Sequence, residues 1–195
     1  MAATRYTVEE FVHDIKPLLE EEKDVQKLLD RGSTYLDRLI RNPDCVPEKF
    51  RVPNAFGTGR PNHGTYSLYQ EAGGLSVSCV VWGPGDHAAP HDHHTWGMIG
   101  LLDNHLTETR FRRLDDGSRE GWCQLEKDRV GEYKPGEITF LIPDIDDIHQ
   151  MDNFTDRPTV EIHVYGQPLA EIKRCRFNVE TGQVFPFQTG KADNE

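Results

Sequence analysis

The 195-residue sequence predicts an all-β fold, a sandwich or small barrel, that follows an N-terminal helical segment. Two observations predict it. Apolar residues recur at helical spacing over residues 1–45, whereas short strand-like runs alternate with clusters of Gly, Pro and Asp from about residue 50 onward. The length suits one domain with a proper core. We therefore expect a single domain over residues 1–195, with the barrel spanning residues 50–190.

Three helices are expected in the N-terminal segment. The first begins at a capping box, in which Thr7 is the N-cap and Glu10 reaches back to it. Pro17 suits the first turn of a second helix, because its missing N–H costs nothing there. The pair Gly32-Ser33 is expected to end that helix and to cap a third. The buried stripes of the last two helices would contain Leu18, Leu19, Val25, Leu28, Leu29, Leu36, Leu39 and Ile40.

Seven strands are expected in the remainder of the chain. They are predicted near residues 65–70, 75–82, 95–102, 106–111, 138–142, 160–165 and 172–177. Turns separate them at Gly83-Pro84-Gly85 and Lys134-Pro135-Gly136, because proline fixes φ and glycine supplies the left-handed position. The spacing of these short strands is typical of a sandwich or barrel.

The composition excludes several classes of partner. With a net charge of -11, the chain would be repelled by the phosphates of nucleic acids and of anionic membranes. No apolar run approaches the ~20 residues that a membrane helix needs, and Met1–Tyr6 has no apolar signal segment. Four scattered cysteines without a C-x-x-C pair indicate reduced thiols. We expect a cytoplasmic protein, and the sequence sets no oligomeric state.

Two histidines one residue apart, His91 and His93, are the strongest chemical signal in the chain. Alternate residues of a strand share a face, so both imidazoles are expected to point into one cavity. His149, in a comparable strand, would complete a metal site, since imidazole is a ligand that iron, copper, zinc and nickel all accept. The neighbouring His94 is expected to face away, and His63 and His105 have ordinary structural explanations.

The spacing around these histidines resembles the two motifs of the cupins, which are double-stranded β-helix (jelly-roll) barrels. The matching residues are Gly85, His91 and His93 in the first motif and Gly136, Pro143, His149 and Asn153 in the second. The usual glutamate of the first motif is replaced by Gly97, which leaves three neutral imidazoles. Asp147, two residues before His149, is the rival carboxylate ligand. Three neutral ligands would favour an anionic substrate ligand such as a thiolate and leave three adjacent positions open.

Longer segments carry a more specific resemblance. Residues 78–85, 91–102, 147–150 and 162–166 closely resemble bacterial thiol dioxygenases of the cysteine dioxygenase superfamily, most of all the branch typified by 3-mercaptopropionate dioxygenase. The likeness covers roughly residues 66–187. That family is a cupin with Fe(II) on three histidines, and it adds both atoms of O₂ to a thiol to give a sulfinate.

The resemblance implies a role for each matched residue. His91, His93 and His149 would hold the iron, and His163 and Tyr165 would form the outer-sphere pair. Period-2 geometry supports this independently, because residues 161, 163 and 165 share one face of a strand. The alternative is that the histidine and tyrosine are core residues satisfied by the backbone.

The chain departs from the family pattern at three places. Glu161 stands where the family has serine, and a carboxylate beside His163 would favour the imidazolium form. Gly97 stands where animal cysteine dioxygenases have a cysteine crosslinked to the catalytic tyrosine, so no crosslink is expected. Leu68 stands where cysteine-specific members bind carboxylate with arginine, and Gln70 is a candidate for the glutamine of the mercaptopropionate branch. The other carboxylate contact of that branch aligns with Arg174, whose ordinary explanation is a surface charge.

These observations predict a mononuclear Fe(II) enzyme that dioxygenates a small, carboxylate-bearing thiol, either 3-mercaptopropionate-like or cysteine. Tyr165, oriented by His163, would hydrogen-bond the bound species, and Arg174 would hold the carboxylate. The partners would be the thiol and O₂ alone. Two alternatives stay open. One is a lyase or isomerase that uses another divalent metal with Glu161 as acid/base, and the other is a non-catalytic cupin that binds a small molecule.

Overall fold

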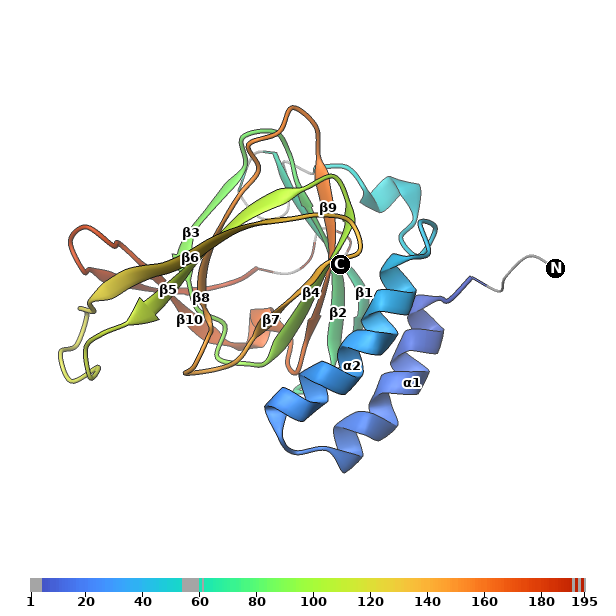
Figure 1. Ribbon diagram of the computed structural model, residues 1–195, viewed down its shortest axis with the longest axis horizontal. Coiled ribbons are helices and arrows are strands. Elements are labelled where there is room, and N and C mark those ends of the chain that lie inside the picture. The colour runs from blue at the N-terminus through green and yellow to red at the C-terminus, as the bar shows by residue number, and fades with distance from the viewer. Residues whose placement is uncertain (1–4, 54–59, 61, 191, 193, 195) are drawn as a thin grey trace.

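The computed structural model describes residues 5–53, 60, 62–190, 192 and 194. Residues 1–4, which belong to the segment in which no signal sequence is expected, lie outside the described residues. Two antiparallel sheets face one another, and two helices cover the outer face of one sheet (Figure 1). This arrangement confirms the predicted jelly-roll with N-terminal helices.

The two sheets contain eleven strands between them. The first sheet has the order β1 (His63–Gln70), β2 (Ser76–Trp82), β9 (Thr159–Tyr165), β4 (Gly97–Asp103) and β7 (Ile138–Leu141). The second has the order β11 (Val184–Gln188), β10 (Lys173–Phe177), β3 (His87–His91), β8 (Ile148–Asp152), β5 (Leu106–Arg113) and β6 (Leu125–Tyr133). Strands far apart in the sequence are neighbours in both sheets, so each sheet gathers side chains from separate motifs.

The first helix, α1 (Val8–Glu21), is longer than expected. It begins at the predicted capping box, where Thr7 and Glu10 exchange hydrogen bonds with each other's backbone. Pro17 lies inside the helix, so the prediction that it opens a second helix was wrong. Pro17 and His13, whose carbonyl loses its helical partner, are both exposed. Water can therefore satisfy that carbonyl, which makes an internal proline tolerable.

The second helix, α2 (Val25–Ile40), contains the residues expected in two helices. The predicted break at Gly32-Ser33 was wrong, because Gly32 serves packing and not chain reversal. A Cβ at Gly32 would lie 3.2 Å from the methyl carbon of Met98 on β4, so glycine lets the helix approach the sheet closely. Neither helix in the described part of the chain has the length and apolar character needed to span a bilayer.

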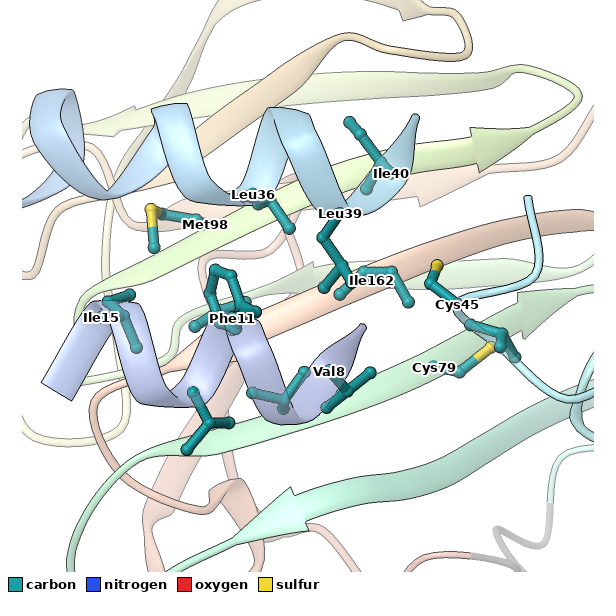
Figure 2. Close-up of a cluster of buried hydrophobic side chains, with 14 of the residues drawn as sticks. Val8, Phe11, Ile15, Leu36, Leu39, Ile40, Cys45, Cys79, Met98 and Ile162 are labelled. Atoms are coloured by element: carbon teal, nitrogen blue, oxygen red, sulfur yellow. The ribbon is translucent and has the colours of Figure 1, made fainter. Parts of the chain in front are cut away.

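The helices and the first sheet share one hydrophobic core. The side chains of Phe11, Ile15, Leu36 and Leu39 are fully shielded from solvent and pack over β4 and β9 (Figure 2). The residues of this core that Figure 2 labels are Val8, Phe11, Ile15, Leu36, Leu39, Ile40, Cys45, Cys79, Met98 and Ile162. All four cysteines of the chain are free thiols, and burial raises the pKa of Cys79 to about 12. This core fixes the outer face of the first sheet and leaves its inner face for the site.

The seven predicted strands are present with shifts of one or two residues at most ends, as β1, β2, β4, β5, β7, β9 and β10. The seven predicted ranges do not include β3, β6, β8 and β11, although a strand was expected at His91 and another at His149. Strand β6 is almost entirely exposed and is held by pairing with β5, so it lacks an apolar face. Strands β3 and β8 were expected only from their histidines, because their polar residues give no run of apolar residues.

Candidate functional site

Three imidazoles converge between the two sheets. His91 is the last residue of β3, and His149 lies opposite it on β8, where the two residues pair across the strands. His93 lies in the loop after β3. All three ring pairs have centroids 4.8 Å apart, and a ligand nitrogen from each residue lies within 4.8 Å of the others. The three residues predicted from the sequence therefore lie together, but the strand alternation expected for His93 was wrong, because a loop positions it.

The histidine tautomers suit metal binding. His91 Nδ1 lies 2.8 Å from the carbonyl oxygen of Ala89, and His149 Nδ1 lies 2.6 Å from the carboxylate of Glu108. His93 Nδ1 lies 3.2 Å from the carbonyl of Asp147. Because each Nδ1–H donates outward, each Nε2 lone pair is left for an ion. Burial lowers the pKa of all three imidazoles, so they are neutral and ready to bind a cation.

Two carboxylates support the ligands from behind. Burial acts to raise the pKa of Glu108, yet the hydrogen bond with His149 and the charge of Arg110 outweigh it and hold that pKa at about 2. Arg110 lies 2.9 Å from the same carboxylate, and its side chain is 1% exposed. The sequence analysis missed both residues, although Glu108-x-Arg110 is an unusual pair of charges for one face of a buried strand.

Asp147 also supports the site and does not join the cluster of ligands. One of its carboxylate oxygens accepts the backbone N–H groups of His93 and His94, at 3.0 and 3.1 Å. The other lies 3.2 Å from His93 Nδ1. Both carboxylate oxygens of Asp147 therefore contact the loop that contains His93 and His94, and the alternative role of Asp147 as a metal ligand is not supported. His94 points away with a left-handed φ of 54°, and its Nε2 lies 3.3 Å from the Asp92 carboxylate.

A chain of hydrogen bonds runs along the inner face of β9. The hydroxyl of Tyr165 lies 2.7 Å from His163 Nδ1, and His163 Nε2 lies 3.0 Å from a carboxylate oxygen of Glu161. The indole N–H of Trp82 donates to the same oxygen at 2.6 Å. The first two of these hydrogen bonds link Glu161, His163 and Tyr165, the three residues that were expected on one face of a strand. Trp82 is a partner that the sequence analysis missed.

Tyr165 is positioned as a hydrogen-bond donor beside the metal ligands. Its ring stacks on that of His93, with centroids 5.8 Å apart and an interplanar angle of 18°. Burial raises the pKa of Tyr165, so the phenol keeps its proton. A Cβ added at Gly97 would lie 2.9 Å from the Tyr165 ring. Glycine at that position therefore leaves the space that the ring occupies.

A cavity of about 460 Å³ opens beside the three histidines. Six histidines and three arginines line it, and none of the described lining residues is an aspartate or glutamate, although the chain has 33 acidic residues. Glu161 is not among the lining residues, so it reaches the cavity only through His163. The cavity therefore suits an anionic ligand.

Arg174 lies in this cavity and is buried, so the surface-charge explanation is wrong. Its guanidinium donates to the carbonyl of Asp92 at 3.1 Å and to the hydroxyl of Thr189. Its Nε has no hydrogen-bond partner in the described part of the protein. A buried, incompletely satisfied guanidinium facing a cavity favours an anionic partner.

The other candidates for carboxylate binding differ from expectation. Leu68 packs against the core beneath the helices, whereas Ser67 lines the cavity. Gln70 lines the cavity at an exposed position. His63 is buried in the cavity wall, with Nδ1 2.7 Å from the carboxylate of Asp86, and His105 is exposed.

A β-sandwich that directs three neutral imidazoles into an interior cavity defines a metal-binding class of protein. The family model described as cysteine dioxygenase type I matches residues 54–178, which is more than half of the chain. The chain therefore belongs to the cysteine dioxygenase type I family.

Three solved structures illustrate the wider likeness. A cupin superfamily protein from Desulfitobacterium hafniense is 10% identical, with 54% of this chain and 78% of that chain covered and a TM-score of 0.41. A protein with a double-stranded β-helix domain from Klebsiella pneumoniae is 14% identical, with 74% and 88% covered and a TM-score of 0.43. An oxalate oxidase in complex with the substrate analogue glycolate is 18% identical, with 58% and 56% covered and a TM-score of 0.44.

Proposed function

We propose that this protein is an Fe(II) thiol dioxygenase whose substrate is a small thiol bearing a carboxylate. The observation that carries the proposal is the placement of Arg174 in the same cavity as His91, His93 and His149. A buried guanidinium with an unpaired Nε suits a carboxylate, and three imidazoles suit a metal that binds a thiolate. The membership of the cysteine dioxygenase family supports the type of reaction.

Iron fits the donor set, because imidazole is a ligand that iron accepts and three protein ligands leave further positions open for substrates. Bound to His91, His93 and His149, Fe(II) would supply sites for the thiolate and for O₂ together. The protein's own residues would then fix the substrate. Arg174 would bind the carboxylate and so orient the thiol sulfur toward the three histidines.

Tyr165 would act as a hydrogen-bond donor to the reacting species. Its phenol is protonated, and its ring is held between His93 and the space left by Gly97. His163 orients the hydroxyl, and Glu161 in turn orients His163. In this scheme Glu161 is a positioning residue, because it lies outside the cavity. The same placement disfavours a lyase in which Glu161 itself is the acid/base.

The cavity favours a thiol acid without an amino group. Cysteine carries an ammonium group in solution, and none of the described lining residues offers a carboxylate to pair with it. Leu68 supports the same choice. It stands where cysteine-specific members have a carboxylate-binding arginine, and it packs against the core under the helices. We therefore propose a 3-mercaptopropionate-like substrate, with cysteine as the alternative.

An oxygen-electrode screen of iron-loaded protein over a panel of thiols tests the proposal, with the sulfinate identified by mass. Metal analysis should find one iron per chain, and His149→Ala should lose most of it. Arg174→Ala should lower kcat/KM for thiol carboxylates by about 10- to 150-fold, the worth of one charge-assisted pair, and far less for cysteamine.

Two results would contradict the proposal. Zinc at full occupancy without oxygen consumption after iron reconstitution would favour a non-catalytic binding protein. A preference for cysteamine over every thiol carboxylate would overturn the substrate class.

A further inference from the structure

We propose that the cavity contains a second anion-binding subsite, formed by Arg176 together with Arg60, and that the substrate is a thiol carrying two acidic groups. The first acid would bind Arg174 and the second would bind Arg176. The thiol chemistry rests on the proposed function, but the second subsite is a separate property of the cavity and can be tested without turnover.

The charge of the cavity wall points to more than one anionic group. Arg60, Arg174 and Arg176 all line the cavity, and the described lining contains no carboxylate. Arg60 already pairs with Asp86, so one substrate carboxylate at Arg174 would leave Arg176 without an anionic partner in the described part of the protein. Cationic walls around a cavity concentrate anions, and they do so despite the net charge of -11 on the whole chain.

Arg176 is placed for the role by its strand. It lies two residues after Arg174 on β10, so both side chains emerge on the same face. It also pairs across the strands with His91, one of the three clustered histidines. In the described part of the protein, no hydrogen bond or ion pair engages its guanidinium. The guanidinium instead makes a cation–π contact with Phe187, whose ring centroid lies 4.3 Å from the guanidinium carbon.

Phe187 contacts both guanidinium groups and so limits the separation between the two subsites. The guanidinium carbons of Arg174 and Arg176 lie 4.5 and 4.3 Å from the centroid of this one ring. The two carbons are therefore no further apart than twice 4.5 Å. Two carboxylates separated by two or three bonds can meet both groups, so the geometry suits a short thiol dicarboxylate.

Arg60 supplies the second cation of the outer subsite. It donates to the Asp86 carboxylate at 2.5 Å and to the carbonyl of His87 at 2.8 Å, and its guanidinium carbon lies 5.1 Å from the centre of the Trp82 ring. These contacts hold it at the cavity wall. Both guanidinium groups line the same cavity, and burial and then the charge of Arg60 lower the pKa of Arg176, so the two cations repel one another. An anion between them would relieve that repulsion.

The size of the cavity agrees with a larger acid. At about 460 Å³ it falls within the range of roughly 300–1,000 Å³ that is typical of pockets for drug-sized ligands. A three-carbon thiol acid has only six heavy atoms. The remaining volume leaves room for a second acidic group in a cavity that Arg60 and Arg176 also line.

The first test compares turnover of 2-mercaptosuccinate and 3-mercaptopropionate by the iron-loaded protein. The wild type should prefer the dicarboxylate in kcat/KM by about 10- to 150-fold, the worth of one further charge-assisted pair. Arg176→Gln should remove most of that preference, and Arg176→Lys should keep part of it. The matched control is Lys173→Gln, which lies on the same strand with an exposed side chain and should keep the wild-type preference.

The second test measures binding without turnover, by titrating succinate and propionate into the protein in a calorimeter. Succinate should bind more tightly than propionate to the wild type but not to Arg176→Gln. Tighter succinate binding with no oxygen consumption on any thiol would support the subsite while the proposed function fails. Equal binding of the two acids, or equal losses for both thiols in Arg176→Gln, would overturn the subsite even if the enzyme oxidises 3-mercaptopropionate.

Discussion

The Nδ1 atom of His149 lies 2.6 Å from a carboxylate oxygen of Glu108, and the two side chains are 2% and 1% exposed. This contact changes the electrostatic interpretation of the site. Three imidazoles alone would leave the full charge of a divalent ion uncompensated. A carboxylate that accepts the Nδ1–H makes the opposite nitrogen a stronger donor, so Glu108 brings negative charge to the ion through His149. Asp147 does the same for His93.

Glu108→Gln should therefore weaken metal binding by about 10- to 100-fold, which is the usual cost of losing such a partner. The affinity can be measured by competition with a chelating dye. Glu126→Gln is the matched control, because Glu126 lies exposed on the neighbouring strand β6 and pairs only with Arg112 in the described part of the chain. An unchanged affinity in Glu108→Gln would mean that His149 is held by the fold alone. Circular dichroism of each variant should show that the sandwich is intact.

The metal-free protein should lose stability as the pH falls below 6.5. Burial lowers the pKa of His63, His91 and His149 from 6.5, so the unfolded chain takes up protons that the folded chain refuses. This contribution is complete above pH 6.5 and is lost below it. Glu108 adds to the loss at lower pH, because its pKa is about 2 in the fold and 4.5 when unperturbed.

Urea unfolding of the metal-free protein at several pH values measures this effect. The free energy of unfolding should be smaller at pH 5 than at pH 7.5. The stabilisation gained on adding a divalent metal should also shrink at the lower pH, since protons compete for the same nitrogens. Stability that stays constant or rises between pH 7.5 and pH 5 would contradict the neutral state of these imidazoles.

Gly97→Ala should lower activity by displacing Tyr165. The added Cβ would lie 2.9 Å from the tyrosine ring, which is closer than side chains tolerate, and at a tight 3.1 Å from a methyl group of Leu141. Overpacking of this kind costs about 1–3 kcal/mol of stability, and a shift of about 1 Å in a reacting group can cost roughly 100-fold in rate. Thermal unfolding and kcat on the preferred thiol measure the two effects.

Gly131→Ala is the control for that substitution. Gly131 also lies in a strand, but a Cβ there would meet only ordinary contacts, beginning at 3.5 Å from the ring of Tyr133. It should leave kcat unchanged. If Gly97→Ala also keeps full activity, then Tyr165 can move without consequence, and its role as a fixed donor is wrong.

Much of the fold could be predicted from local patterns, and the errors have clear physical causes. The capping box at Thr7 depends on neighbours in the sequence, so it was found correctly. Gly32 was misinterpreted as a helix end because its purpose is contact with Met98, a residue far away in the sequence. Strand β6 has no buried apolar face, and only its pairing with β5 identifies it as a strand.

The site shows the same division. His91, His93 and His149 carry a recognisable spacing, and the alternation of Glu161, His163 and Tyr165 on β9 predicts their shared face. The carboxylates that contact the Nδ1 atoms of these histidines, Glu108 and Asp147, lie at no recognisable spacing in the sequence. Glu108 approaches His149 from β5 only because β5 and β8 are neighbours in the second sheet, which no local pattern reveals.

The final prediction concerns how Glu161 acts. Its carboxylate accepts hydrogen bonds from Trp82 and His163 but does not line the cavity, so its effect on the reaction must pass through His163 to Tyr165. Glu161→Gln replaces the charged oxygen that accepts both hydrogen bonds with a neutral carbonyl oxygen, so the contact that orients His163 should weaken. We expect kcat to fall by about 10- to 150-fold, the worth of a hydrogen bond to a charged group.

A double-mutant cycle separates this role from a purely structural one. In the Tyr165→Phe background the hydroxyl that His163 orients is gone, so Glu161→Gln should cost little more, with a coupling energy of about 0.5–3 kcal/mol between the two sites. The fluorescence of Trp82 should report the altered carboxylate contact in both backgrounds. Independent, multiplicative losses in the two single variants would show that Glu161 supports the enzyme by a route that does not include Tyr165.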